Sequence, residues 1–320
     1  MARVIVTRRM PGPVEDRLRA AGLEVETNPD DAPYSRERLI AALQTADGVL
    51  LAVNDVVDGS LLDAGGRRRA RILANFGVGV NHIDLDAAKA RGVVVTNTPG
   101  VLTDATADLA MALILAATRR MSEMEALLRR SEWRGFSPTA HLGMGLQGRT
   151  LGIVGMGRIG AATARRAVLG FGMRAIYFNR SAVGPFDFAA EARPSIEAVM
   201  AEADAVSLHA PGGGANRGLI SAERLALMKP TAYLVNTARG DVVDEAALVA
   251  ALAAGRIAGA GLDVFADEPS VPAALMALPN VTLLPHIGSA TVETRTAMGM
   301  LAAENLIAYF EGRPLPSPVV

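Results

Sequence analysis

The sequence contains no cysteine among its 320 residues. This absence excludes disulfide bonds, thiolate metal ligands and cysteine nucleophiles. Histidine is also scarce, and its four copies are scattered at no spacing typical of zinc ligands. We therefore expect no bound metal, and any acid–base chemistry by an imidazole must come from one of these four side chains.

A charge excess and a long apolar run are missing as well. The 32 basic and 33 acidic residues nearly cancel, so no global field attracts nucleic acid or an anionic membrane. No apolar run is long enough to span a bilayer, and the N-terminus enters a predicted strand without the pattern of a signal peptide. We expect a cytoplasmic protein with neither nucleic-acid nor membrane partners.

A glycine-rich segment between two predicted strands is the most informative stretch that is present. The apolar run Thr150–Val154 predicts a buried parallel strand, and Gly155-Met-Gly-Arg-Ile-Gly160 follows it as G-x-G-x-x-G. Helix formers fill residues 161–169, Gly170 marks the expected helix end, and residues 174–178 predict the second strand. This strand–turn–helix–strand context predicts a dinucleotide site.

Each glycine of the motif has a separate physical role in such a site. Gly155 allows the tight turn, Gly157 lets the backbone approach a pyrophosphate, and Gly160 lets helix and strand pack closely. The phosphates would bind the free N–H groups at the helix N-terminus. The alternative is a glycine-rich turn in another kind of α/β protein, and we favour the dinucleotide site.

The end of the second strand predicts which dinucleotide binds. NAD sites place an Asp or Glu about 20 residues after the glycines to hold the ribose 2′-hydroxyl, whereas this chain has Asn179-Arg180-Ser181. Arg180 can bind a 2′-phosphate as a forked donor, and Asn179 and Ser181 can add hydrogen bonds. We expect NADP(H) to be preferred, with NAD(H) possible as a second cofactor.

Strands alternate with helices along almost the whole chain, which predicts an α/β fold with doubly wound parallel sheets. The predicted strands are 3–7, 23–26, 48–53, 71–75, 93–97, 150–154, 174–178, 205–209, 233–236, 258–264 and 281–284. The predicted helices are 13–21, 35–43 with Ser35 as N-cap, 84–90 capped by Asp84, 104–118, 161–169, 221–228, 245–254 and 291–310. Ligands of such folds bind beyond the carboxyl ends of the strands.

Thr98-Pro99-Gly100 interrupts the alternation and predicts a domain boundary. The helix at 104–118 is apolar nearly all round, so we expect it to be buried between domains or in a subunit contact. Residues 121–148 have little periodicity and predict a long irregular excursion, an arm that packs on a partner chain.

Three ionisable residues follow predicted strands in the second half, namely Arg239, Glu268 and His286. Arginine offers a bidentate fork for a carboxylate. Histidine titrates near neutral pH and serves as acid in one direction and base in the other, and a paired carboxylate stabilises its charged form. These are the groups that hydride transfer to a 2-keto acid requires.

Motifs along nearly the whole chain resemble the D-2-hydroxyacid dehydrogenase family. They are GIVGMGRIG, LVNTARGDVVDEAAL, GAGLDVFADEP, LLPHIGSAT, ILANFGVGVNHIDLDAA and TPGVLTDATADLAMALIL. Support is weakest before about residue 45 and across 121–146. Within the family, the NRS segment is similar to NADPH-dependent glyoxylate and hydroxypyruvate reductases, and Glu268 differs from the Gln of formate dehydrogenases.

The resemblance implies a role for each matching residue. Arg239 would bind the substrate carboxylate and carbonyl, His286 would be the acid–base, and Glu268 would be its partner. Val78 and Gly79 would offer backbone N–H groups to the substrate carboxylate. Further contacts to the cofactor would come from Thr106, Gly155, Arg158, Ile159, His209, Pro211, Thr237, Ala238, Asp263, His286 and Gly288.

The resemblance also implies an architecture of two Rossmann-like domains with the active site in the cleft between them. Residues 1–98 with 288–320 would form a flavodoxin-like, substrate-binding domain, and 99–287 the dinucleotide-binding domain. The helix and arm at about 104–148 would build a homodimer.

One departure from the family concerns substrate size. Glyoxylate and hydroxypyruvate reductases often carry a bulky aromatic near position 140, whereas this chain has Ala140. Our leading hypothesis is an NADPH-dependent reductase of small 2-keto acids, glyoxylate or hydroxypyruvate. The alternatives are an NAD-linked dehydrogenase of a larger D-2-hydroxy acid and, less favoured, a dinucleotide-gated binding module such as the corepressors that resemble this family.

Overall fold

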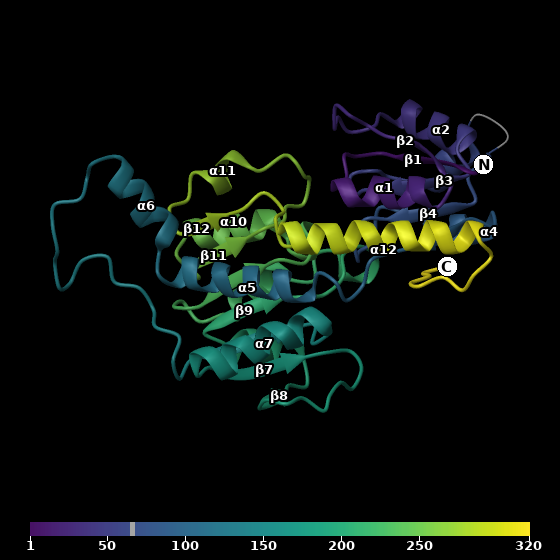
Figure 1. The fold of residues 1–320 in the computed structure, drawn as a ribbon. Coiled ribbons are helices and arrows are strands. Elements are labelled where there is room, and N and C mark those ends of the chain that lie inside the picture. Colours follow the sequence, from purple (N-terminus) through teal and green to yellow (C-terminus); the bar gives the residue numbers. More distant parts are fainter. Residues whose placement is uncertain (65–67) are drawn as a thin grey trace. The chain divides into compact units, whose positions relative to one another are not determined.

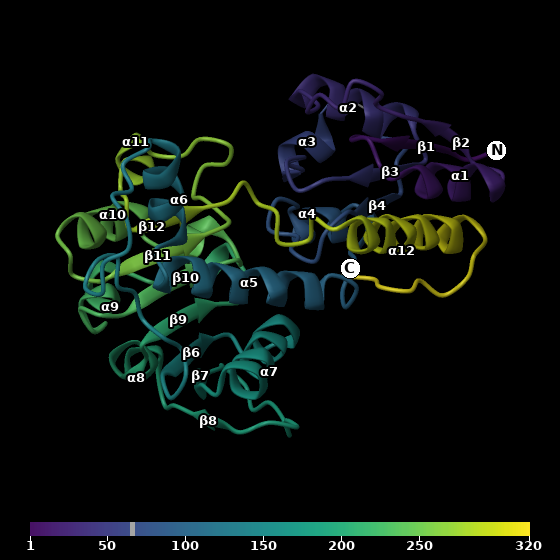
Figure 2. The same ribbon diagram turned by 60° about the vertical axis from the view of Figure 1, so that its left-hand side comes forward.

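The computed structural model describes residues 1–64 and 68–320. They form two units, Met1–Leu102 with Ser289–Val320 (unit 1) and Thr103–Gly288 (unit 2). The sequence-based boundaries lie at 98/99 and 287/288. Figures 1 and 2 show the ribbon from two directions.

Unit 1 contains a parallel sheet of the order β2-β1-β3-β4-β5. This is the flavodoxin-like order. Its strands are β1 (Arg3–Val6), β2 (Glu24–Glu26), β3 (Gly48–Leu51), β4 (Ile72–Asn75) and β5 (Val94–Thr96). Its helices are α1 (Gly12–Ala20), α2 (Arg36–Thr45), α3 (Gly59–Asp63), α4 (Leu85–Ala90) and α12 (Val292–Phe310).

Alternating side chains of the unit 1 strands reach two separate cores. Val4 and Val6 pack with α1 and α12 on one face, whereas Ile5 packs with α2 and α3 on the other. This is the period of two that a strand covered on both faces requires. The predicted N-caps are confirmed, since Ser35 accepts a hydrogen bond from the Arg38 N–H at 3.3 Å and Asp84 accepts one from the Ala87 N–H at 2.9 Å.

Unit 2 contains a parallel sheet of the order β12-β11-β10-β9-β6-β7-β8. Its strands are β6 (Thr150–Val154), β7 (Arg174–Phe178), β8 (Ala190–Ala192), β9 (Ala205–Leu208), β10 (Tyr233–Asn236), β11 (Gly259–Leu262) and β12 (Val281–Leu283). Its helices are α5 (Thr103–Thr118), α6 (Met121–Arg129), α7 (Arg158–Phe171), α8 (Ile196–Glu202), α9 (Ala222–Ala226), α10 (Glu245–Ala253) and α11 (Ala273–Met276). The strand order reverses between β6 and β9, and this is the switch point where dinucleotides bind in Rossmann folds.

The fold class predicted from the sequence, two doubly wound parallel α/β domains, is confirmed. The helix α5 packs on one side against its own unit. Met111 and Ile114 pack into the core that α5 shares with α7 and the sheet of its own unit. These apolar side chains of α5 are therefore buried within unit 2.

Two helix predictions were wrong in detail. The helix α7 runs through Gly170 and ends at Phe171, because Gly172 takes the left-handed conformation (φ +61°) that closes a helix. The helix α6 lies in the segment predicted to be irregular. Its apolar residues Met121, Met124, Leu127 and Leu128 have helical spacing that the sequence analysis missed, although none of its side chains is buried within the described chain.

The short elements α3, β8, α8 and α11 were also missed, and each offers too few turns or residues for a periodic pattern. None of the described helices is long and apolar enough to cross a membrane.

Candidate active site

The glycine loop between β6 and α7 has the geometry of a phosphate cradle. Gly155 has φ +95°, and an added Cβ would lie 2.8 Å from the His209 carbonyl carbon. A Cβ on Gly160 would lie 2.3 Å from the Gly155 oxygen, so both positions require glycine. Gly157, the N-cap of α7, is exposed with no atom near its missing Cβ, and no side chain caps the helix. The free N–H groups therefore face open space, which fits a pyrophosphate.

Asn179 ties the end of β7 to this loop. Its Oδ1 accepts the Met156 N–H at 3.0 Å, and its Nδ2 donates to the Ser181 carbonyl at 2.9 Å. The sequence predicts Asn179 as a ligand of the 2′-phosphate. In the structure its side chain is hydrogen-bonded to the backbone of Met156 and Ser181. Arg180 and Ser181 are exposed beside it, and the Arg180 guanidinium makes no hydrogen bond within the described residues.

Three of the predicted cofactor contacts, Thr106, Asp263 and Gly288, lie together. A Cβ built on Gly288 would lie 3.2 Å from Asp263 Oδ2 and 3.4 Å from Thr106 Cγ2. After β10, Thr237 has a buried hydroxyl with no hydrogen-bond partner among the described residues, and the Ala238 N–H donates to Asn236 Oδ1 at 3.0 Å. An orphaned buried hydroxyl costs free energy unless a ligand satisfies it, which fits a bound cofactor here.

His209 and Pro211 follow β9, next to the glycine loop. The His209 Nε2 and the Ser207 hydroxyl are 2.9 Å apart. Burial lowers the pKa of His209 to about 4, so its ring is neutral at pH 7. A neutral ring carries no charge toward a bound dinucleotide.

His286 and Glu268 form a hydrogen-bonded pair after β12 and β11. The His286 Nδ1 lies 2.7 Å from Glu268 Oε2, while Glu268 Oε1 accepts the Phe265 N–H at 3.1 Å. Burial raises the pKa of the Glu268 carboxyl, but its hydrogen bond and charge interaction with His286 outweigh burial, so this pKa is lowered overall. The carboxylate is therefore ionised at neutral pH and orients the ring.

Asp263, at the end of β11, fixes the backbone that carries His286. Its two carboxylate oxygens accept the N–H groups of Ile287 at 2.7 Å and Gly288 at 2.8 Å, and its carbonyl accepts the His286 N–H at 2.8 Å. His286 itself has φ +53°, a conformation that side chains rarely adopt. The sequence analysis predicted Asp263 as a cofactor contact and missed its hydrogen bonds to the backbone after His286. Burial raises the pKa of Asp263.

The loop that carries Arg239 packs tightly against the segment that leads to Glu268. A Cβ on Gly240 would lie 1.8 Å from the Phe265 carbonyl carbon, so no other residue fits without displacing the backbone. Burial lowers the pKa of Arg239, opposed by the charges of Glu268 and Asp241, and its guanidinium donates to the Ala238 carbonyl at 2.6 Å. Sequence reasoning missed Gly240, whose only signal was its position after the arginine.

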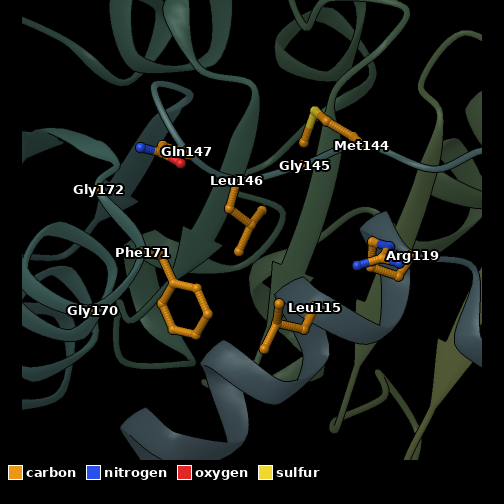
Figure 3. A pocket seen from close by; sticks show the side chains of 9 residues that line it. All are labelled: Leu115, Arg119, Met144, Gly145, Leu146, Gln147, Gly170, Phe171 and Gly172. Carbon is orange, nitrogen blue, oxygen red and sulfur yellow. The ribbon is translucent and has the colours of Figure 1, made fainter.

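Val78 and Gly79 lie in unit 1, in the loop after β4, and both are half-buried. Within the described parts of the chain, no three His, Asp or Glu side chains are grouped as metal ligands. A separate cavity of about 460 Å³ lies in unit 2 between α5, α7 and residues 144–147. Figure 3 shows its lining, in which the polar side chains of Arg119 and Gln147 stand beside apolar ones, and none of its residues belongs to the predicted site.

The comparisons with known proteins agree with this geometry. Residues 111–288 match the family model described as D-isomer specific 2-hydroxyacid dehydrogenase, NAD binding domain. Over 99% of its length the chain is 44% identical to the glyoxylate reductase of Thermococcus litoralis, covering 96% of that protein. It is 45% identical to the glyoxylate reductase of Aeropyrum pernix, covering 99% of this chain and 95% of that one.

Solved structures are similar over the whole chain. The TT0316 protein of Thermus thermophilus has 47% identity and a TM-score of 0.90, covering 99% of this chain and 100% of that one. The NADPH-dependent glyoxylate/hydroxypyruvate reductase of Sinorhizobium meliloti, solved with NADP and malonate, has 38% identity and a TM-score of 0.88, covering 100% and 97%.

Proposed function

Because this chain belongs to the D-isomer specific 2-hydroxyacid dehydrogenase family and is an NAD(P)-dependent oxidoreductase, we propose that it reduces glyoxylate or hydroxypyruvate to the D-2-hydroxy acid with NADPH. The observation that carries the proposal is the 2.7 Å hydrogen bond between His286 and Glu268 at the carboxyl edge of the unit 2 sheet. The pair would supply a proton donor at the sheet edge where we expect hydride transfer.

Each of the three charged side chains would take one part of the reaction. When bound, the reduced nicotinamide supplies the hydride that adds to the keto carbon. Arg239 would bind the substrate carboxylate and carbonyl oxygen, and it keeps its charge because guanidinium does not deprotonate in proteins. His286 would donate a proton to the developing alkoxide, and Glu268 would stabilise the imidazolium before transfer.

Unit 2 would hold the dinucleotide. The Val78 and Gly79 N–H groups would bind the substrate carboxylate. The uncapped N-terminus of α7 would bind the pyrophosphate, and the exposed Arg180 would pair with the 2′-phosphate. No carboxylate stands at residues 179–181 to repel that phosphate, which favours NADP(H) over NAD(H).

We also propose a homodimer built by the arm. Residues 121–148 expose five large apolar side chains, with Met121 55%, Leu128 60%, Trp133 57%, Phe136 89% and Leu142 66% exposed. In Figure 1 the loop after α6 projects from the packed part of unit 2. A patch of this kind on an extended segment is typical of a protein–protein interface.

The test is cofactor oxidation at 340 nm with a panel of 2-keto acids, using NADPH and NADH in parallel. We expect turnover of glyoxylate and hydroxypyruvate, with a higher kcat/KM for NADPH. Selective turnover of larger 2-keto acids with NADH would favour the NAD-linked alternative. Absence of turnover with every acid would contradict the proposal, and so would full activity of His286→Ala.

A further inference from the structure

Three consecutive carbonyl groups in the loop after β4 are held by side-chain amides. The Asn75 Nδ2 donates to the carbonyls of Gly77 at 3.0 Å and Gly79 at 2.9 Å. The Asn97 Nδ2 donates to the intervening carbonyl of Val78 at 2.9 Å. All three carbonyls therefore point toward the protein.

The orientation of the Asn75 amide is fixed by its neighbours. Asn75 is completely buried, and its Oδ1 lies 3.1 Å from His82 Nε2. Since the Gly77 and Gly79 carbonyls can only accept, Nδ2 must face them, and the remaining Oδ1 faces the His82 ring nitrogen. Asn97 is held in turn by Ser317, whose hydroxyl donates to the Asn97 carbonyl at 2.6 Å.

Peptide geometry converts these hydrogen bonds into a direction for two N–H groups. In a trans peptide the carbonyl of one residue and the N–H of the next point in opposite directions. Holding the Gly77 carbonyl inward therefore turns the Val78 N–H outward, and holding the Val78 carbonyl inward turns the Gly79 N–H outward. Neither N–H donates to another described residue, and both residues are half-buried.

We propose that Asn75 and Asn97 are positioning residues that hold the Val78 and Gly79 N–H groups ready for the carboxylate of the 2-keto acid. Adjacent backbone N–H groups that point the same way bind anions. The clamp consists of neutral amides, so it adds no charge that would compete with the substrate. This inference rests on the proposed function, which supplies the carboxylate.

The chain offers a closely matched control for a test of the clamp. Asn28 also lies in unit 1, is completely buried, and donates from Nδ2 to two carbonyls, those of Thr7 at 2.8 Å and Ala32 at 2.7 Å. Neither of these carbonyls belongs to the loop after β4. Asn75→Asp and Asn28→Asp each keep the side-chain size and remove both donated hydrogen bonds.

The experiment measures oxalate binding to the enzyme–NADP⁺ complex by calorimetry, together with glyoxylate kinetics and the Kd of NADPH. For Asn75→Asp we expect the oxalate Kd and the glyoxylate KM to rise about tenfold or more, as for lost hydrogen bonds to a charged group. The kcat and the NADPH Kd should change by less than about threefold, because the interaction binds ground state and transition state alike. Asn97→Ala should weaken oxalate in the same direction, and Asn28→Asp should bind it like the parent.

Amide NMR spectra separate a failure of the clamp from a failure of the proposed function. If the parent turns over no 2-keto acid, the function is wrong, yet oxalate shifts of the Val78 and Gly79 amide signals that vanish in Asn75→Asp would still support the clamp. Parent-like oxalate binding by Asn75→Asp and Asn97→Ala would overturn it, as would an equal loss in Asn28→Asp. If Asn75→Asp does not fold, Asn97→Ala decides.

Discussion

At the scale of single residues, His286 depends on contacts from three directions. Asp263 holds the backbone on both sides of it, Glu268 holds Nδ1, and the left-handed φ of +53° turns the ring toward that carboxylate. A strained backbone of this kind persists only where its surroundings hold it. The proposed proton donor is thus positioned by contacts within the protein itself.

The Glu268→Gln variant tests the charge on the partner of His286. The lowered pKa of Glu268 keeps it ionised at neutral and alkaline pH. Gln keeps the shape and a hydrogen bond but removes the negative charge, and a nearby negative charge favours the protonated form of an acid–base group. We expect the alkaline limb of keto-acid reduction in kcat/KM to move down by about one pH unit or more, and the rising limb of hydroxy-acid oxidation to move the same way.

The measurement is the pair of pH profiles, taken with deuterated NADPH to show that hydride transfer limits the rate. If both limbs of the kcat/KM profiles of Glu268→Gln lie at the same pH as in the parent, Glu268 does not act on the acid–base through its charge.

The Arg180→Ala variant tests cofactor selection. Only NADPH carries the phosphate that Arg180 would bind, so kcat/KM with NADPH should fall roughly 10- to 150-fold, as expected for a charge-assisted hydrogen bond of about 1.5–3 kcal/mol. The value with NADH should change little. Arg158→Ala in the first turn of α7 is the control, because a pyrophosphate contact would affect both cofactors equally. Equal losses for both cofactors in Arg180→Ala would refute the assignment.

At the scale of elements, packing within the chain decides which apolar faces are covered. The strands and α7 have apolar faces because they cover a sheet, whereas α6 has apolar residues at helical spacing and no buried side chain within the described chain. The exposed apolar residues of α6 and of the loop after it fit the proposed contact with a second copy of the chain.

Substitution of the arm therefore tests the proposed dimer. Trp133→Ser with Phe136→Ser should shift the mass measured by light scattering from dimer toward monomer, because burying large aromatic side chains dominates interface free energy. Met276→Ser on α11 is the control, an apolar residue 59% exposed outside the arm, and it should stay dimeric. A monomeric parent, or an unchanged mass in the double variant, would remove the arm from the interface.

At the scale of the whole molecule, each unit buries hydrophobic clusters of its own. The clusters around Val4 and Val49 belong to unit 1, and those around Val206 and Ile153 belong to unit 2. A unit with its own core can unfold on its own. Ligands of one unit should then stabilise that unit selectively.

Calorimetry with NADP⁺ tests this expectation. At 100 times its Kd the ligand should stabilise unit 2 by about 2.7 kcal/mol and raise the Tm of its transition by about 5–10 °C. Asn28 lies in unit 1, so Asn28→Asp should lower the Tm of the other transition and thereby identify it as the unfolding of unit 1. A single transition that moves as one would contradict independent unfolding.

The sequence by itself determined the features that depend on near neighbours along the chain. The strand Thr150–Val154, the glycine spacing of 155–160 and the N-cap at Ser35 are local patterns, and the structure has each of them. Arg239 and His286 were found because each follows a strand whose carboxyl end must lie at the ligand edge. The confirmed fold class follows from the alternation of strands and helices.

Only the tertiary structure decided which distant groups meet. Gly240 has no room for a side chain because the Phe265 backbone passes beside it, and Asp263 braces residues 287 and 288 because β11 and β12 are neighbours in the sheet. Asn75 and Asn97 hold one loop because β4 pairs with β5. Strand order sets such partners, and an amide or carboxylate looks the same in a sequence whichever N–H or carbonyl it finally meets.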